Sequence, residues 1–458
     1  MSAHSASSPA LDWAGLGVAV VVAAIGAGLG FWQVLPAQQV IVYTAATLAL
    51  VLWAWTHFIA RRRAAAAAPR DEGGPSGRAV FRAWLKKHRA ILITLGLIAA
   101  VYIGVAFAVT AFLTWGSLLA VVLLMVLLVL SVQVSRLFAD NRSAFIGLTV
   151  LVALFALGSG TVDGFSSTTN LKSMLVFAAF LGLACVGQTL VALLGGLDLS
   201  IPFVIGASNV GLLYLIGLGV PSWMAVIIII LLGAAIGFVN GILSFRLQGQ
   251  ALILTLGVGF AVSGAIQIIT SIGTAFAGNV FGTVPDWLRN LAAMNGRTFG
   301  LNLPPVILIW AVVAIVLIWG LKNTTYGRQL YALGGNRTSA SRVLISERRY
   351  WVGVYMISGA ISALTGSLLL GWSGGGFIGV GQPYLFMTLA AVVIGGTSLL
   401  GGNGGYGFTV IGVCVLQVLT SFLVGIGLKY EWQQFIFGIL ILPMVALYAR
   451  SPHIRTQI

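Results

Sequence analysis

Long apolar runs alternate with short polar segments along this chain. About 20 consecutive apolar residues are needed for an α-helix to cross the hydrocarbon core of a bilayer. The pattern therefore predicts an all-α polytopic membrane protein with about 14 transmembrane helices. The expected spans lie near residues 14–35, 38–60, 91–113, 116–138, 143–160, 173–194, 199–217, 222–244, 250–271, 304–321, 351–371, 384–400, 407–427 and 432–449.

The basic residues give these spans an orientation. If the N-terminus is cytoplasmic, all but four of the 24 lysines and arginines fall in segments on the cytoplasmic side. The four exceptions are Lys172, Arg289, Arg297 and Lys429. Because lysine and arginine concentrate in cytoplasmic loops, we expect an even number of spans with both termini in the cytoplasm.

Composition supports the membrane class and explains the net charge. The chain is 59% hydrophobic and 7% charged, whereas soluble proteins carry about 25% charged residues. The net charge of +15 follows from basic cytoplasmic loops that face anionic lipid, so we expect membrane lipid and no nucleic acid as a partner. Cys185 and Cys414 fall in apolar runs and fit no disulfide or metal-ligand spacing.

A charged segment divides the chain. Residues 61–89 are rich in Arg, Ala, Gly and Pro and are predicted to form a basic cytoplasmic linker. The linker separates an N-terminal transmembrane hairpin, residues 1–60, from a second hairpin, residues 90–140, and a core of residues 141–458 follows. Within the linker, residues 78–89 fit either an amphipathic helix on the inner leaflet or a simple basic anchor.

Enzymatic chemistry finds little support in the sequence. A P-loop needs G-x-x-x-x-G-K followed by Ser or Thr, and this pattern does not occur. Asp198 is the one acid placed well inside the membrane region or at a break within it, and no Lys, Arg or His lies deep in an expected span, so a proton relay is not expected. We therefore expect a protein that is not an enzyme, has no ATPase site of its own and holds no metal or cofactor.

The segment GGLDLSIP predicts an interrupted membrane helix. Gly195 and Gly196 can end one helix, and Pro202 suits the first turn of the next. Asp198 or Ser200 can then cap the second helix by accepting backbone N–H groups. A cap at a buried break is the favoured interpretation, and direct contact with a solute is the alternative.

Five segments together resemble the permease subunits of ribose-type, simple-sugar ABC importers. They are GGLDLSIP (195–202), GFVNGILSFRL (237–247), ILTLGVGFAVSGAIQIIT (253–270), GRQLYALGGNRTSASRVLI (327–345) and LAAVVIGGTSLLGGNGGYGFTVIG (389–412). The resemblance covers about residues 143–458 and includes their order and spacing. The same superfamily contains permeases for branched-chain amino acids, nucleosides and autoinducer-2.

The resemblance implies a ten-helix permease core for a monosaccharide or related small polar solute. It implies a second permease copy or paralogue, a cytoplasmic ABC ATPase that binds ATP and Mg²⁺, and a periplasmic or lipid-tethered solute-binding protein. It also implies the bacterial cytoplasmic (inner) membrane. The first four spans have no counterpart in the usual permease. A self-sufficient secondary transporter and a membrane scaffold remain alternatives.

The resemblance also assigns an ATPase-coupling loop to residues 322–350. We expect Gly334 and Gly335 to turn the chain and residues 339–345 to form a short helix. The candidate coupling residues are Gly334, Gly335, Asn336, Ser339, Ala340, Arg342 and Ile345. Where the family usually has Leu-Ser-Gly-Ile, this chain has Arg342, Val343, Leu344 and Ile345, which suggests an altered fit to the ATPase.

Several amides lie within the expected spans and are candidates for the solute pathway. They are Gln188, Asn209, Asn240, Gln267 and Gln417. Each is expected to make interhelical hydrogen bonds more often than to touch solute.

Overall fold

The computed structural model describes residues 142–247, 251–271, 278–298 and 303–448. These residues belong to one compact unit of the chain, residues 126–458. The two expected N-terminal hairpins, the linker and both termini lie outside the described residues.

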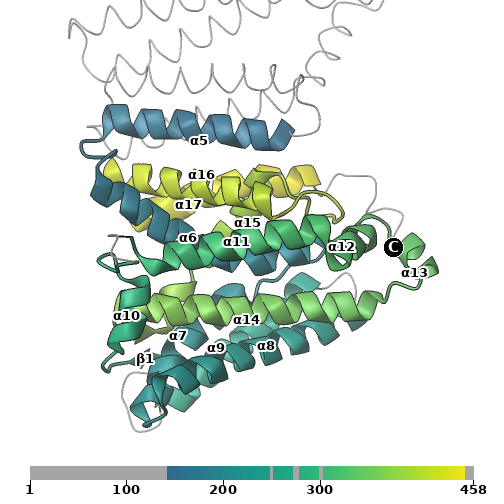
Figure 1. Ribbon diagram of the computed structural model, residues 1–458, viewed down its shortest axis with the longest axis horizontal. Helices are drawn as coiled ribbons and strands as arrows, with labels where there is room; N and C mark the ends of the chain where they lie inside the picture. The colour runs from purple at the N-terminus through teal and green to yellow at the C-terminus, as the bar shows by residue number, and fades with distance from the viewer. Residues whose placement is uncertain (1–141, 248–250, 272–277, 299–302, 449–458) are drawn as a thin grey trace, which may run out of the picture. The chain divides into compact units, whose positions relative to one another are not determined.

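The described part is almost entirely helical, so the all-α class is confirmed (Figure 1). One long helix occupies each span expected from residue 143 onward. These helices are α5 (Arg142–Thr161), α6 (Thr168–Leu193), α7 (Ile201–Gly217), α8 (Ser222–Arg246), α9 (Ala251–Ser271), α11 (Pro305–Asn323), α14 (Glu347–Ser373), α15 (Tyr384–Gly395), α16 (Tyr406–Gly425) and α17 (Tyr430–Tyr448). By length and hydropathy, 7 described segments qualify to cross a membrane. The span count of the whole chain and the side of its termini stay predictions.

Short elements lie at the two ends of the helix bundle. At one end are α10 (Asp286–Ala292), the 3₁₀-helix η3 (Ile378–Gly381) and a small antiparallel pair of strands, β1 (Asn279–Val280) and β2 (Gly376–Phe377). At the opposite end lie α12 (Thr325–Gly335) and α13 (Arg337–Arg342), as the labels of α10 and α13 show (Figure 1). This second end carries the expected coupling loop.

One expected span is shorter than its apolar run. The run predicted a span over residues 384–400, but α15 ends at Gly395. Gly396 follows in the left-handed conformation with φ 99°, and its N–H bonds back to Val392 and Val393. A left-handed glycine closes a helix in this way, so the residues beyond it form a loop.

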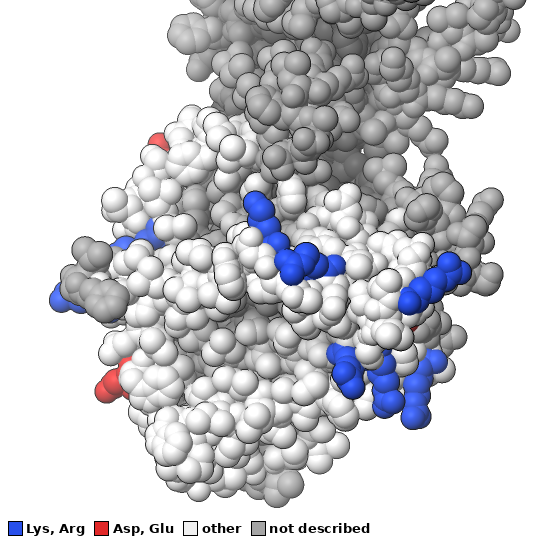
Figure 2. Space-filling view, turned by 45° about the vertical axis from the view of Figure 1, so that its right-hand side comes forward, with Lys and Arg blue, Asp and Glu red and all other residues white. Residues whose placement is uncertain are grey.

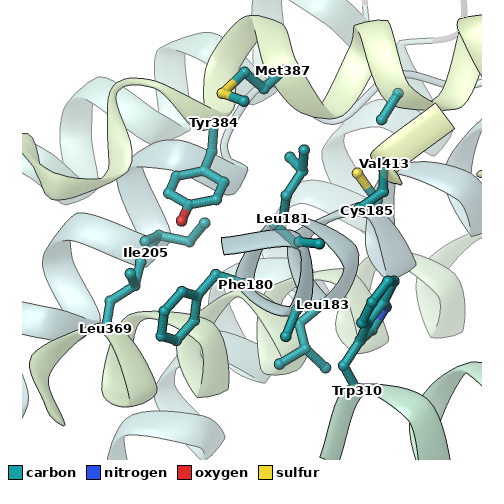
Figure 3. Close-up of a cluster of buried hydrophobic side chains, with 14 of the residues drawn as sticks. Phe180, Leu181, Leu183, Cys185, Ile205, Trp310, Leu369, Tyr384, Met387 and Val413 are labelled. Carbon is teal, nitrogen blue, oxygen red and sulfur yellow. The ribbon is translucent and has the colours of Figure 1, made fainter. Parts of the chain in front are cut away.

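Helix α6 lies at the centre of the core. Its Phe180, Leu181 and Leu183 are buried among side chains of five other helices (Figure 3). Those neighbours include Ile205, Trp310, Leu369, Tyr384, Met387 and Val413. By contrast, Phe260 of α9 and Ile315 of α11 are 60% and 67% exposed. The outer helices thus present apolar faces suited to lipid or to another membrane helix.

Small residues bring α8 and α14 into close contact. A methyl group added at Gly237 would lie 2.1 Å from the carbonyl oxygen of Tyr355. The same addition at Gly359 would lie 2.1 Å from the carbonyl oxygen of Gly233. Membrane helices approach closely at such positions, so α14 packs tightly on α8 and carries its polar residues to the helix break.

Candidate functional site

Helix α6 ends at Leu193 and α7 begins at Ile201, and the break between them contains the Gly195–Gly196 pair. Gly195 adopts φ 78°, and its N–H donates to the carbonyl of Ala192. The N–H of Gly196 donates to the carbonyl of Val191. These two bonds form a Schellman motif, which satisfies carbonyls at the end of a helix. Pro202 is the second residue of α7.

Asp198 lies buried within this break, with 2% of its surface exposed. Its Oδ1 accepts from the backbone N–H and the hydroxyl of Ser200, at 3.0 Å and 2.6 Å. Its Oδ2 accepts from the Ser358 hydroxyl of α14 at 2.7 Å. The N-cap residue of α7 is Ser200, whose own side chain makes no capping bond. The carboxylate therefore binds the N-cap residue itself and no N–H inside the first turn, so the expected capping of that turn by Asp198 or Ser200 is not found.

A chain of hydrogen bonds joins α8 to the break. The side-chain amide of Asn240 donates to the Ser200 hydroxyl at 2.8 Å. One turn further along α8, the Ser244 hydroxyl donates to the Asn240 carbonyl at 2.6 Å and accepts from Trp351 Nε1 at 2.8 Å. Polar side chains of two helices, α8 and α14, therefore donate hydrogen bonds to side chains in the break.

A second bond from α14 reaches the loop of the break directly. The Tyr355 hydroxyl donates to the carbonyl of Leu197 at 3.1 Å. Trp351, Tyr355 and Ser358 follow one another at spacings of four and three residues, so they share one face of α14. That spacing was a signal in the sequence that could have pointed to them.

Arg337 links the short helix α13 to the same break. Its Nη2 donates to the carbonyl of Leu194, the C-cap residue of α6, at 3.1 Å. Its guanidinium lies 4.7 Å from the ring centroid of Trp351. Its Nη1 also lies 3.3 Å from Glu347 Oε1, an ion pair without hydrogen-bond geometry. Sequence reasoning did not single out this arginine, although it lies inside the quoted coupling segment.

Three glycine-rich segments that are distant in the sequence meet at the end of α6. The N–H of Gly402 donates to the carbonyl of Leu193 at 2.9 Å. A methyl group added at Gly334 would lie 1.8 Å from that same carbonyl oxygen. One added at Gly401 would lie 3.0 Å from the backbone nitrogen of Gly195. The glycines therefore permit backbone contact between the break, the coupling loop and the loop after α15.

The coupling loop turns at a different residue from the one expected. Gly334 and Gly335 belong to the last turn of α12, and the chain changes direction at Asn336, which has φ −158° and ψ 101°. The side chain of Asn336 caps α13 by accepting the N–H of Ser339 at 2.9 Å. Because of this cap, α13 begins at Arg337 rather than at Ser339.

The same helix ends three residues earlier than expected. It closes at Arg342, and Leu344 follows with a positive φ of 62°. Ala340 is buried, and Ile345 packs against the same core cluster. Arg342 is exposed. The structure thus places the candidate residues of the loop partly in the core and partly on the surface.

The other candidate amides of the spans differ in whether their side chains have a described hydrogen-bond partner. Asn209 donates to the carbonyl of Gly366 at 3.3 Å and accepts the N–H of Phe377 at 3.0 Å. Gln267 donates within α9, to the Ser263 carbonyl and hydroxyl. Gln188 is fully buried, and neither of its side-chain polar atoms has a described partner. Gln417 is also buried.

The end of the bundle that carries α13 is basic. Figure 2 shows Lys and Arg side chains gathered there. Exposed basic residues of this end include Lys322, Arg328, Arg342, Arg348 and Arg349. Burial and the neighbouring Tyr350 raise the pKa of Tyr326 in α12 to about 12, so that phenol adds no negative charge near neutral pH. Among the described residues, no group of three or more His, Cys, Asp or Glu is placed to hold a metal ion.

The sequence of the chain is similar to those of known transport permeases. Residues 170–445 match the family described as the permease component of branched-chain amino acid transport systems. The chain is 29% identical over 316 residues to the ribose import permease protein RbsC of Haemophilus influenzae, covering 68% of this chain and 94% of that protein. It is 29% identical over 304 residues to the fructose import permease protein FruG of Bifidobacterium longum, covering 66% and 88% of the two chains. It is 32% identical over 310 residues to the probable ABC transporter permease protein YphD of Escherichia coli, covering 67% and 90%.

Proposed function

The chain belongs to the family of permease components of branched-chain amino acid transport systems, and from this we propose that it forms the membrane pathway of an ATP-driven sugar importer. The chain is a multi-pass protein of the bacterial inner membrane. Its proposed solute is a monosaccharide or a related small polar molecule, because relatives similar to it are named for import of ribose and fructose.

The observation that carries this proposal is the contact between the coupling loop and the break between α6 and α7. Arg337 joins α13 to the end of α6, and Gly334 lies against the same carbonyl region. An interrupted membrane helix is tolerated where protein or a water-filled cavity satisfies its backbone. A displacement of α13 is therefore transmitted to the break without a flexible connection between them.

The proposal assigns the energy source to a partner. The sequence contains no P-loop, so a separate cytoplasmic ABC ATPase would bind ATP and Mg²⁺ and dock at α12 and α13. A second permease copy or a paralogue would complete the pathway, and a periplasmic or lipid-tethered binding protein would deliver the solute. The chain itself would hold no cofactor and catalyse no reaction.

Reconstitution tests the proposal. Proteoliposomes that contain the chain, its ATPase and its binding protein are loaded with ATP, and uptake of radiolabelled ribose, fructose and related sugars is measured. Uptake should require all three proteins and hydrolysable ATP. A matched preparation carries an ATPase whose P-loop lysine is replaced, and it should be inactive.

Two outcomes would contradict it. Uphill uptake by the chain alone, driven by an ion gradient, would establish a secondary transporter instead. Uptake of nucleosides, autoinducer-2 or amino acids, with no uptake of sugars, would keep the importer and replace the solute.

A further inference from the structure

The first turns of α7 and α15 meet inside the helix bundle. A methyl group added at Gly381, just before α15, would lie 1.8 Å from the carbonyl oxygen of Pro202 in the first turn of α7. Ile205 and Tyr384 pack in one core cluster with Leu181, which lies midway along α6 (Figure 3). Helices α7 and α15 therefore both begin beside the middle of α6, at a place here called the central junction.

The start of α7 has no side-chain cap. The first N–H groups of an α-helix find no partner within the helix. The N-cap residue Ser200 makes no capping bond, because its hydroxyl donates to Asp198 and accepts from Asn240. Buried backbone donors need a partner such as a side chain or an ordered water. The central junction therefore offers backbone donors to a polar group placed beside it.

Two polar side chains of the core are buried without a partner among the described residues. They are Gln188 of α6 and Ser362 of α14, which are 0% and 1% exposed. Neither the amide oxygen and nitrogen of Gln188 nor the hydroxyl of Ser362 makes a hydrogen bond there. Most buried polar atoms make at least one, and an exception calls for a specific explanation.

Gln188 lies on the face of α6 that is turned towards the central junction. It follows Phe180 and Leu181 by eight and seven residues, so it lies between them around the helix axis. Figure 3 shows Ile205 of α7 and Tyr384 of α15 on the side of α6 that lies between these two side chains. The amide of Gln188 is therefore directed to the place where both helices begin.

Ser362 faces the start of α7 from the opposite helix. One turn before it, the Ser358 hydroxyl donates to Asp198. One turn after it, a methyl group added at Gly366 would lie 2.3 Å from the carbonyl oxygen of Ile205. Residues four apart share one face of a helix. Ser362 therefore faces the part of α7 that lies between Asp198 and Ile205.

The two unpartnered side chains also lie at a similar depth in the bundle. A methyl group added at Gly196 would meet Tyr355, and one added at Gly187 would meet Ser358, so α14 runs antiparallel to α6. The turn of α14 after Ser358 therefore lies towards the start of α6. A helical side chain covers the turn that precedes it, so Gln188 extends in that same direction. The polar groups of α6 and α14 thus converge on the central junction.

The surroundings determine what the central junction can hold. Ile201 and Ile205 are 1% and 0% exposed, so an occupant is enclosed and small. The buried carboxylate of Asp198 disfavours an anion. Gln188 presents N–H donors as well as an acceptor oxygen, so a molecule that both donates and accepts hydrogen bonds fits better than a cation.

We propose that an ordered water molecule binds at the central junction, with hydrogen bonds to Gln188, to Ser362 and to the first turn of α7. A buried water typically makes about three hydrogen bonds to polar groups of this kind. The water connects α7 to both α6 and α14 where α15 also begins. The proposal concerns the bundle itself and does not depend on the transported solute.

Radiolytic footprinting tests for the water directly. The full-length chain in nanodiscs, in sugar-free buffer, receives millisecond X-ray pulses, which convert bound water into hydroxyl radicals that oxidise adjacent side chains. Ile201 and Ile205 should be oxidised although they are buried. Leu212 is the matched control, because it is a fully buried residue of the same helix and should stay unmodified. The double variant Q188M/S362A should lose the oxidation of Ile201 and Ile205.

Thermal stability gives an independent test whose sign decides the question. Methionine is close to glutamine in shape and has no amide. If Gln188 binds water, Q188M should lower the melting temperature, and if the amide is unpaired, Q188M should raise it. S362A should also lower the melting temperature. The double variant should show less than the sum of the two shifts, because both side chains bind the same water.

Three results would overturn the proposal. One is oxidation of Ile201 and Ile205 in the wild-type chain that is no greater than that of Leu212. Another is a melting temperature of Q188M above that of the wild type. The third is a fully additive pair of shifts for Q188M and S362A. Each leaves the proposed transport function untouched, since none of these measurements involves uptake.

Discussion

Replacement of Arg337 by glutamine should loosen the break between α6 and α7. The substitution removes a charged donor from the Leu194 carbonyl, a contribution of about 1.5–3 kcal/mol. It also removes a cation–π contact with Trp351 of about 0.5–1 kcal/mol and a partly exposed ion pair with Glu347 of about 0.2–1 kcal/mol. The side chains of that pair are 28% and 24% exposed. Because contributions in one network do not add fully, we expect a net loss of about 2–3 kcal/mol.

Hydrogen exchange measures this loss at the place where it should occur. If residues 194–200 open locally, a loss of about 2–3 kcal/mol raises their exchange rate by about 30- to 150-fold. R348Q is the matched control, because Arg348 is exposed and has no contact recorded among the described residues. Combining R337Q with W351L should give less than the sum of the two single effects, since both remove the same cation–π contact.

Two results would refute this reasoning. Equal exchange of residues 194–200 in R337Q and R348Q would show that Arg337 does not hold the break. Fully additive effects of R337Q and W351L would show that the guanidinium and the indole are not coupled.

Three further predictions follow from the same site. G334A should destabilise the chain by about 1–3 kcal/mol, because its methyl group would lie 1.8 Å from the Leu193 carbonyl oxygen. A methyl group at Gly335 meets open space, so G335A should leave the melting temperature the same or higher. Equal melting temperatures of G334A and G335A would contradict the packing. D198N should retain most sugar uptake in proteoliposomes, because asparagine can still accept the Ser200 N–H. D198L should lose sugar uptake, because the Ser200 N–H and the Ser358 hydroxyl would be left buried and unpaired, at a cost of about 1–3 kcal/mol each. Equal uptake by D198N and D198L would count against the role of Asp198 as an acceptor at the break. W351F should lower the melting temperature by an amount corresponding to more than about 1 kcal/mol, because the bond from the indole N–H to the Ser244 hydroxyl is lost and the smaller phenyl ring leaves part of a buried site unfilled. An S244A background should reduce this difference without abolishing it, and an unchanged difference would contradict the hydrogen bond.

The helices of this protein follow from local sequence. An apolar run long enough to cross a bilayer satisfies its backbone within itself, so its presence does not depend on its neighbours. The break at Gly195 was also predictable, because the left-handed end of α6 requires a residue without a Cβ atom. The bounds of the short helix in the coupling loop were predicted wrongly, because Asn336 caps α13 at its start and the helix ends at Arg342, two residues before the left-handed Leu344.

The contacts that make the candidate site belong to the tertiary structure. Arg337 and Leu194 are separated by 143 residues in the chain, and Asp198 and Ser358 by 160. No local pattern records which turn of α14 faces α6, because that choice depends on how closely α8 and α14 approach through glycines such as Gly237. The sequence by itself therefore determined which segments enter the membrane and where one of them breaks, since both depend on local polarity and backbone freedom. Packing of distant helices alone decided which polar groups stabilise that break.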